Sequence, residues 1–246
     1  MSIKETDCHA YSDIWGGVHP EIMMVEDSHQ PVRQVVRRTR GRVLGRYPSL
    51  KNGRMVSWES QLEQKACSVF EFSRSIKSYF EQPATFALKR NNDVISYTPD
   101  FLLKSIDSGD IYVEVKPLKY LVEQNVTEKL QLFGDHLTQR GASLIALTEV
   151  ELDNIILQSN LALLRQYSRA QVDNCLIRRA IEIVSNSPVS IESLSAELKS
   201  SACVIALLAR NYLTFDYLEP LLPSSIVHLP KEKDDAHTLF SKKRTY

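Results

Sequence analysis

The amino-acid sequence predicts a mixed α/β domain followed by a smaller helical domain. Three features lead to this prediction. A helical pattern precedes three segments with strand character, and a second helical pattern leads into a short buried strand. This order is typical of an α/β sandwich in which a meander of three strands is followed by a helix and then by a parallel strand. After Thr148 the pattern changes to consecutive helical segments, which indicates a second domain.

The first helix is expected to begin at Ser57, whose hydroxyl suits an N-cap, with Glu59 in the first turn. Apolar residues recur at helical spacing from Trp58 to Phe70. Residues 70–80 are expected to continue or follow that helix.

Three strands are expected next, over Thr85–Leu88, Val94–Leu103 and Ile111–Val115. Turn-forming residues separate them, at Asn91–Asp93 and at Ser108–Gly109. The three segments are therefore expected to form the meander.

A second helix is expected over Asn125–Arg140, with Thr127 as its N-cap and Gly141 at its end. Ser143–Thr148 is short and apolar, which favours a buried strand.

The C-terminal part has the element order of a winged helix. Helical patterns cover residues 150–168, 171–186, a segment from Ser190, and 201–211, and a small hairpin is expected from Leu213–Phe215 and Ile226–Leu229. A helix that reads DNA carries several polar side chains, whereas residues 201–211 are strongly apolar and contain one arginine. We therefore expect that helix to be buried, and residues 165–230 to dock a protein partner.

These patterns predict four parts of the chain. They are an N-terminal arm with a basic segment (1–55), an α/β domain (56–150), a helical, winged-helix-like domain (151–230) and a charged tail (231–246).

The charge of the chain is unevenly distributed although its formal net charge is zero. Residues 1–30, which we expect to form a loosely ordered arm, hold one lysine and six acidic residues. Residues 30–58 hold eight lysines and arginines and no acidic residue. Such a run favours a polyanionic partner such as DNA, and the alternative is a solvated basic linker.

Other features of the sequence exclude several classes of protein. The four cysteines lie far apart and form no C-x-x-C pair, which argues against a disulfide framework or a zinc site. The N-terminus lacks the pattern of a signal peptide, and the longest apolar run, Ala202–Ala209, is too short to span a bilayer. A cytoplasmic protein is expected.

Two carboxylates and an amine lie among the expected strands. Asp100 follows a proline, and Glu114 and Lys116 share one face of their strand because they are two residues apart. Carboxylate oxygens suit Mg²⁺, and Lys116 would orient or deprotonate a water, or stabilise charge on a phosphate. The alternative is an ion-pair cluster on an edge strand.

The segment Pro99-Asp100…Glu114-Val115-Lys116 resembles the PD-(D/E)xK motif of the restriction-endonuclease-like superfamily, whose αβββαβ core matches the expected order. A narrower resemblance is to the N-terminal domain of TnsA, the endonuclease subunit of heteromeric cut-and-paste transposons. The segments that carry it are Gly45-Arg46-Tyr47-Pro48-Ser49, Lys51-Asn52-Gly53-Arg54, Glu59-Ser60-Gln61-Leu62-Glu63, Glu81-Gln82-Pro83 and Thr127-Glu128-Lys129-Leu130.

This resemblance implies the residues of a metal-dependent active site. Glu63, Asp100, Glu114 and Lys116 would be catalytic, and the carbonyl of Val115 would join Asp100, Glu114 and Glu63 around Mg²⁺, for which Mn²⁺ is a possible substitute. Glu59, one helical turn from Glu63, is assigned to stabilising the helix dipole instead.

The resemblance also implies an activity and partners. Family members nick one strand at transposon ends, opposite the strand cut by a DDE-type transposase, and an AAA+ ATPase regulator contacts both proteins. A bacterial cytoplasmic protein with no membrane partner is expected. The alternatives are a stand-alone restriction or repair nuclease and a catalytically inactive DNA-binding adaptor. The DNA-binding residues that we predict are Arg37, Arg38, Arg40, Arg42, Arg46, Lys51, Arg54, Lys119 and Lys129.

Overall fold

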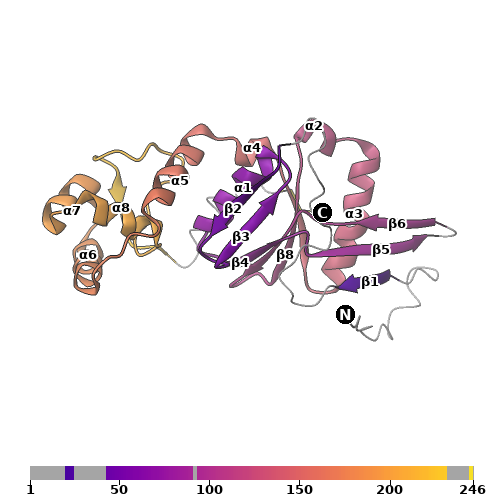
Figure 1. The fold of residues 1–246 in the computed structure, drawn as a ribbon, viewed down its shortest axis with the longest axis horizontal. Coiled ribbons are helices and arrows are strands. Elements are labelled where there is room, and N and C mark those ends of the chain that lie inside the picture. Colours follow the sequence, from indigo (N-terminus) through magenta and orange to yellow (C-terminus); the bar gives the residue numbers. More distant parts are fainter. Residues whose placement is uncertain (1–19, 25–42, 91–92, 232–243, 246) are drawn as a thin grey trace. The chain divides into compact units, whose positions relative to one another are not determined.

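The computed structural model describes residues 20–24, 43–90, 93–231 and 244–245. In chain order its elements (Figure 1) are β1 (Pro20–Met24), β2 (Gly45–Ser49), β3 (Arg54–Trp58), α1 (Gln61–Phe72), β4 (Ile76–Glu81), β5 (Ala84–Arg90), β6 (Asp93–Tyr97), β7 (Phe101–Ser105), β8 (Asp110–Val115), α2 (Leu118–Leu121), α3 (Gln124–Gln139), β9 (Ser143–Leu147), α4 (Glu149–Leu152), α5 (Ile155–Tyr167), α6 (Asn174–Asn186), β10 (Val189–Ser190), α7 (Ile191–Leu198), α8 (Ser201–Ala209), β11 (Ile226–Val227) and β12 (Arg244–Thr245). Within these ranges, no helix is long and apolar enough to cross a membrane.

The described residues form two compact units. Those within Met1–Gln64, Lys77–Ala146 and Arg244–Tyr246 form the first unit, and those within Lys65–Ile76 and Leu147–Lys243 form the second. The boundary between the units therefore falls inside α1. The four-part division expected from the sequence stays a prediction.

The main sheet of the fold has five strands in the order β12-β9-β8-β7-β4. Strands β7 and β8 are antiparallel, with Phe101 opposite Val113, and α3 connects β8 to its neighbour β9. Together α1, β4, β7, β8, α3 and β9 give the αβββαβ order of the prediction. The predicted α/β class and this core are confirmed.

The segments that form the three central strands of the core differ from the segments predicted to form them. The strand expected at Thr85–Leu88 belongs to β5, which pairs with β6 and β1 in a separate sheet of order β1-β5-β6. The single strand expected over Val94–Leu103 is divided into β6 and β7. The reason is local, because Pro99 lies at the division and has no backbone N–H to donate to a ladder.

Strand β1 corrects the expectation for the N-terminal arm. Pro20–Met24 pairs in antiparallel register along β5, from Pro20 opposite Leu88 to Met24 opposite Ala84. A partner so distant in sequence decides this pairing, and local composition gives no sign of it. The remainder of the arm lies outside the described residues.

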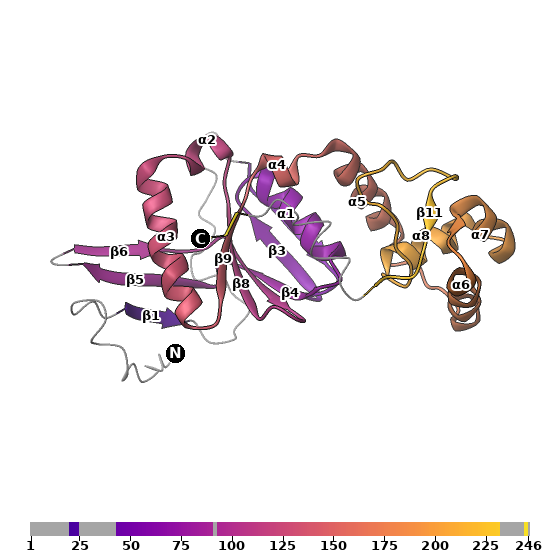
Figure 2. The same cartoon turned by 180° about the vertical axis from the view of Figure 1, so that it is seen from behind.

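Helix α3 packs on the small sheet in the first unit. Figures 1 and 2 show it beside β5 and β6 from opposite sides. The ring of Phe133 lies 5.0 Å from that of Tyr97 and 6.4 Å from that of Phe86, and the Phe86 ring contacts Tyr112 of β8 edge-on at 5.2 Å. Burial of these rings anchors the small sheet to the helix that follows β8.

The first helix begins later than expected. Ser57 lies in β3, which pairs with β2 from Gly45 opposite Trp58 to Ser49 opposite Arg54. Alternate residues of β3, Val56 and Trp58, are buried, so tertiary pairing outweighs the helical spacing there. Ser60 is the residue that caps α1, because its Oγ accepts the backbone N–H of Glu63 at 3.1 Å.

Two further boundaries are corrected. Helix α1 ends at Phe72, and part of the helical segment expected over residues 70–80 is strand β4. Thr127 is not the N-cap of α3, because the helix begins at Gln124 and the Thr127 hydroxyl donates to the carbonyl of Leu121 at 2.9 Å. Gly141 ends this helix with a φ of 74°, as predicted.

The second unit contains helices in all the segments where they were expected, but the segment expected over residues 150–168 is divided into α4 and α5 at Asp153 and Asn154. Its predicted buried helix is α8, in which Val204, Leu207 and Leu208 are fully buried, and that prediction is confirmed. Strand β10 pairs with β11, and an isolated bridge joins Thr214 to His228. The winged-helix assignment itself stays a prediction.

Candidate active site

Asp100 and Glu114 lie side by side at the meeting of β7 and β8. Because Phe101 is opposite Val113, the residue before Phe101 lies level with the residue after Val113. The backbone N–H of Val115 donates to Asp100 Oδ2 at 2.7 Å. The antiparallel pairing thus brings together the two carboxylates that the sequence places fourteen residues apart.

Glu114 is buried and has two polar neighbours. Lys116 Nζ lies 2.8 Å from its Oε1, and the Tyr97 hydroxyl donates to its Oε2 at 3.0 Å. Lys116 lies one residue beyond the end of β8, and it forms an ion pair with Glu114. The side chain of Lys116 is 33% exposed, so its ammonium remains accessible to a ligand from solvent.

Glu63 enters the site from the first turn of α1. Its Oε2 accepts the backbone N–H of Glu59 at 2.8 Å, and its Oε1 accepts the hydroxyl of Ser60 at 3.0 Å. These bonds pair polar groups at the start of the helix, much as a capping box does. Glu59 precedes α1 and so has no first-turn position, and its Oε1 accepts the Nε2–H of Gln82 at 3.0 Å.

The three carboxylates act on one another electrostatically. Burial raises the pKa of Asp100 well above its ordinary value, and the charges of Glu114 and Glu63 raise it further. Burial also raises the pKa of Glu63, with smaller contributions from Glu59 and Glu114. The site therefore concentrates negative charge in a place that water screens poorly.

Two lysines face this negative charge. Burial lowers the pKa of Lys116, but Glu114 and Asp100 outweigh that effect and its pKa is raised overall. Burial lowers the pKa of Lys129 on α3, against the charge of Glu114, and its Nζ lies 5.6 Å from the centre of the Tyr97 ring. Lys129 thus lies within the electrostatic influence of Glu114, and its contact with phosphate stays a prediction.

The donor set matches a hard cation in its chemistry. Carboxylates of Asp100, Glu114 and Glu63 and the carbonyl of Val115 are the oxygen ligands that Mg²⁺ prefers, and a cation would offset the repulsion that raises the pKa of Asp100. Across the residues described, however, no three Asp, Glu, His or Cys side chains are grouped closely enough to hold a metal ion. The bonds from Lys116 to Glu114 and from Ser60 to Glu63 occupy oxygens that a cation would need.

The predicted DNA-binding residues occupy different surroundings. Arg37, Arg38, Arg40 and Arg42 lie outside the described residues. Arg46 is exposed on β2, Lys51 is half-buried in the turn between β2 and β3, and Lys119 is exposed on α2 with its Nζ 4.6 Å from the Tyr120 ring centre. These side chains remain candidates for phosphate contact.

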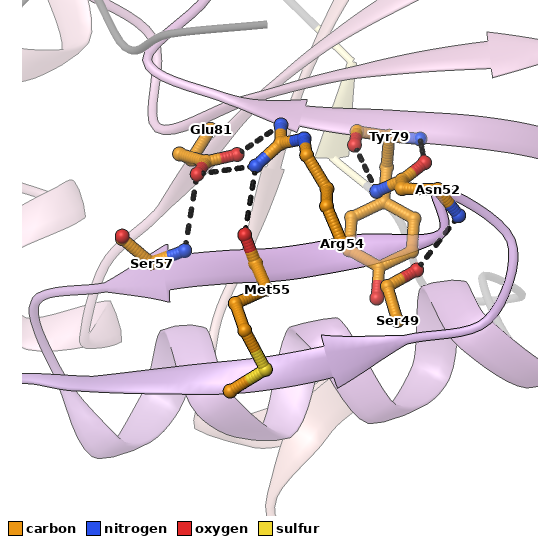
Figure 3. Close-up of polar contacts among 7 residues, drawn as sticks. All are labelled: Ser49, Asn52, Arg54, Met55, Ser57, Tyr79 and Glu81. Atoms are coloured by element: carbon orange, nitrogen blue, oxygen red, sulfur yellow. Dashed lines mark hydrogen bonds and ion pairs between the residues drawn. The ribbon is translucent and has the colours of Figure 1, made fainter.

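Arg54 forms an ion pair within the fold (Figure 3). Its guanidinium binds both carboxylate oxygens of Glu81, at 2.8 and 2.6 Å, and donates to the carbonyl of Met55 at 2.9 Å. Glu81 also accepts the backbone N–H of Ser57 at 3.1 Å. This pair fastens the β2–β3 hairpin to the end of β4. The predicted phosphate contact of Arg54 stays a prediction.

Sequence reasoning missed Tyr97 and Gln82. Tyr97 is buried and its hydroxyl touches a predicted catalytic carboxylate. Gln82 is buried beside Asp100 and Glu59. Tyr97 shows only the alternation of an ordinary strand, while the signal for Gln82 was present in the segment Glu81-Gln82-Pro83, which carries part of the resemblance.

The mixed α/β fold and its core order are consistent with the restriction-endonuclease-like class. Residues 73–149 match the family model of the TnsA-like endonuclease N-terminal domain. The match includes Asp100, Glu114 and Lys116, whereas Glu63 precedes it. No curated protein matches the chain significantly.

Proposed function

We propose that the chain is a metal-dependent DNA endonuclease that nicks one strand at transposon ends during cut-and-paste transposition. The TnsA-like family is one of nucleases related to transposition, and it implies a DNA substrate and a transposase partner. The observation that carries the proposal is the adjacency of Asp100, Glu114 and Lys116 at the β7–β8 junction inside that domain. Glu63 supplies the remaining carboxylate.

The cofactor of this reaction is proposed to be Mg²⁺, with Mn²⁺ as a substitute. Asp100, Glu114, Glu63 and the Val115 carbonyl would hold the ion, which polarises a phosphoryl oxygen and lowers the pKa of a bound water. Among the four, Asp100 is the best placed to respond to a cation, because burial and then the charges of Glu114 and Glu63 raise its pKa. The binding residues are proposals from family likeness and donor chemistry.

Lys116 is proposed to act as a cation and not as a base. Its raised pKa means that it keeps its proton at neutral pH. An ammonium can donate hydrogen bonds to the attacking water or to a phosphate oxygen as negative charge develops there. The proton that the attacking water loses passes to the solvent, since Lys116 keeps its own proton and Glu63 is assigned to the cation.

The remaining partners follow from the same proposal. A DDE-type transposase would cut the opposite strand, and an AAA+ ATPase regulator would contact both proteins. The second unit is proposed to carry the protein-docking function, since its helix α8 is buried and cannot read a DNA groove along its length. The arginine run and Arg46 are proposed to hold the DNA backbone.

The test is strand cleavage by an Asp100→Asn variant in a reaction reconstituted with the transposase, the regulator, Mg²⁺ and DNA carrying transposon ends. The amide keeps the shape of the side chain but removes its charge. We expect nicking to fall by about two orders of magnitude or more, while assembly on DNA persists.

The matched control is Asp107→Asn, which removes the same charge from the exposed turn between β7 and β8. It should cut like the wild type. Undiminished nicking by Asp100→Asn would contradict the active-site assignment, and efficient specific cutting without a transposase would favour the stand-alone nuclease instead.

A further inference from the structure

The side chain of Tyr97 places a polar group inside an apolar cluster. It is 5% exposed and belongs to the same hydrophobic core as Phe86, Leu121 and Phe133. A phenylalanine would fill such a place with no polar atom to satisfy, whereas a buried hydroxyl costs free energy unless it finds a hydrogen-bond partner. The partner of this hydroxyl therefore indicates why the position holds a tyrosine.

The ring of Tyr97 is held by a sheet and by a helix. Tyr97 is the last residue of β6 and lies opposite Phe86 of β5, so strand pairing fixes its backbone. The centre of its ring lies 5.0 Å from that of Phe133 on α3, and Nζ of Lys129, one turn earlier on α3, lies 5.6 Å from it. A ring packed in this way keeps its hydroxyl at a defined point.

The two carboxylate oxygens of Glu114 have different partners. Oε2 accepts the hydroxyl of Tyr97 at 3.0 Å, and Oε1 lies 2.8 Å from Nζ of Lys116. Both oxygens belong to one planar group, so the bond from Tyr97 restricts where Oε1 can lie. A continuous polar chain thus runs from β6 through Glu114 to the ammonium of Lys116.

The end of this chain at Lys116 is its accessible part. The side chain of Lys116 is 33% exposed, whereas that of Glu114 is 9% exposed. A lysine has a long and flexible stem, so an unrestrained ammonium would occupy many positions. An ammonium bound to a fixed carboxylate has lost much of that freedom before a substrate arrives.

We infer that Tyr97 is a positioning residue that acts through the carboxylate of Glu114 to hold the ammonium of Lys116 in place for DNA cleavage. The inference rests on the proposed function, in which that ammonium donates to the attacking water or to a phosphate oxygen. Each link is a contact between residues of the chain itself. Precise placement matters because a displacement of about 1 Å can slow a reaction about 100-fold.

The test is a Tyr97→Phe variant of the full chain, which removes the hydroxyl and keeps the ring. We expect the ammonium protons of Lys116 to exchange with water about tenfold faster because the ion pair is loosened, as measured by ¹⁵N NMR of lysine side chains without DNA. In the reconstituted reaction we expect the single-turnover nicking rate to fall about 10- to 100-fold while the affinity for DNA is unchanged.

Tyr112→Phe is the matched control. Tyr112 lies in the same hydrophobic core, is 7% exposed, and its ring contacts Phe86 edge-on at 5.2 Å. The variant removes the same group from the same cluster, and it should change neither the exchange rate nor the nicking rate. A Glu114→Ala background tests the route, because adding Tyr97→Phe there should not speed the exchange further.

Unchanged ammonium exchange in Tyr97→Phe, or faster exchange with an unchanged nicking rate, would overturn the inference. Faster exchange on adding Tyr97→Phe to Glu114→Ala would also overturn it, since Tyr97 would then act by another route. If the wild-type protein does not nick DNA, the proposed function fails and the claim for cleavage fails with it. The exchange rates then still decide whether Tyr97 holds Lys116 through Glu114.

Discussion

At the scale of single residues, the site is formed by carboxylates whose surroundings oppose their ionisation. Burial and neighbouring charge raise the pKa values of both Asp100 and Glu63. The folded chain therefore retains protons that the unfolded chain releases above about pH 4. The ionised carboxylates of Asp100 and Glu63 are therefore electrostatically unfavourable, and they lie where the proposed chemistry needs a cation.

A pH dependence of stability follows from these two shifts. A carboxyl group with a raised folded-state pKa contributes stability that is fully present below its unfolded pKa and is lost as pH rises through its folded pKa. Without divalent cations, the contribution of Asp100 and Glu63 to stability should therefore decline as the pH rises above about 4. Asp100→Asn should be more stable than wild type at the high end, and the difference should shrink towards the low end.

Thermal unfolding of both proteins in a chelating buffer across this range measures the effect. The exposed-site variant Asp107→Asn should follow the wild type at every pH. Coincident unfolding curves for wild type and Asp100→Asn at the high end would show that the Asp100 charge does not destabilise the fold.

The residues of the site were predictable to different degrees. Asp100, Glu114 and Lys116 stand out because charged side chains are unusual among apolar strand residues at such spacing. Tyr97 and Gln82 do not stand out, because a tyrosine on a strand and a glutamine before a proline are ordinary. Their importance depends on contacts with Glu114 and Glu59 that only the folded chain creates.

At the scale of elements, the helices and strands with the strongest apolar periodicity were predicted correctly. Helix α3 and strands β8 and β9 have apolar periodicity that tertiary contacts reinforce. The β2–β3 hairpin and β4 were missed because their strand character is decided by partners. Asn52 in the hairpin, for example, pairs with the backbone of Tyr79 in β4, far along the chain.

The hairpin also depends on close contact between Gly45 and Trp58. A Cβ at position 45 would lie 2.1 Å from Trp58 Cζ2, and Trp58 is 8% exposed. We expect Gly45→Ala to destabilise the protein by about 1–3 kcal/mol, because the buried ring has little room to move. Chemical denaturation measures the change.

A Trp58→Phe background is the control for this prediction. The smaller ring should relieve the overlap, so the alanine should destabilise that background by less than it destabilises the wild type. An equal penalty in both backgrounds would mean that the overlap with the Trp58 ring is not the cause.

At the scale of the whole molecule, a formal net charge of zero conceals a strongly basic segment. Binding to DNA through phosphates releases counterions, so the salt dependence of the affinity reports how many phosphates the protein neutralises. Replacing Arg37, Arg38, Arg40 and Arg42 with alanine should weaken DNA binding. It should also reduce the slope of log K against log salt by about 0.9 for each phosphate that the variant no longer neutralises.

Fluorescence anisotropy at several salt concentrations measures this slope. The comparison is a variant with four alanines at exposed basic positions of the second unit, Arg169, Arg178, Arg210 and Lys231, which loses the same charge. Equal slopes for the two variants would mean that the arginine run contributes no more to DNA binding than other exposed basic residues, as expected of a linker.

Strand β4 ends the five-stranded sheet, and the side chain of Asn52 has a consequence there for solubility. An unpaired sheet edge can recruit a strand from another molecule and so start aggregation. The Asn52 amide donates to the carbonyl of Tyr79 at 2.6 Å and accepts its N–H at 3.2 Å, as a neighbouring strand would (Figure 3). The Asn52 side chain thereby pairs one backbone position of this edge, and we expect it to hinder a strand of another molecule from pairing there.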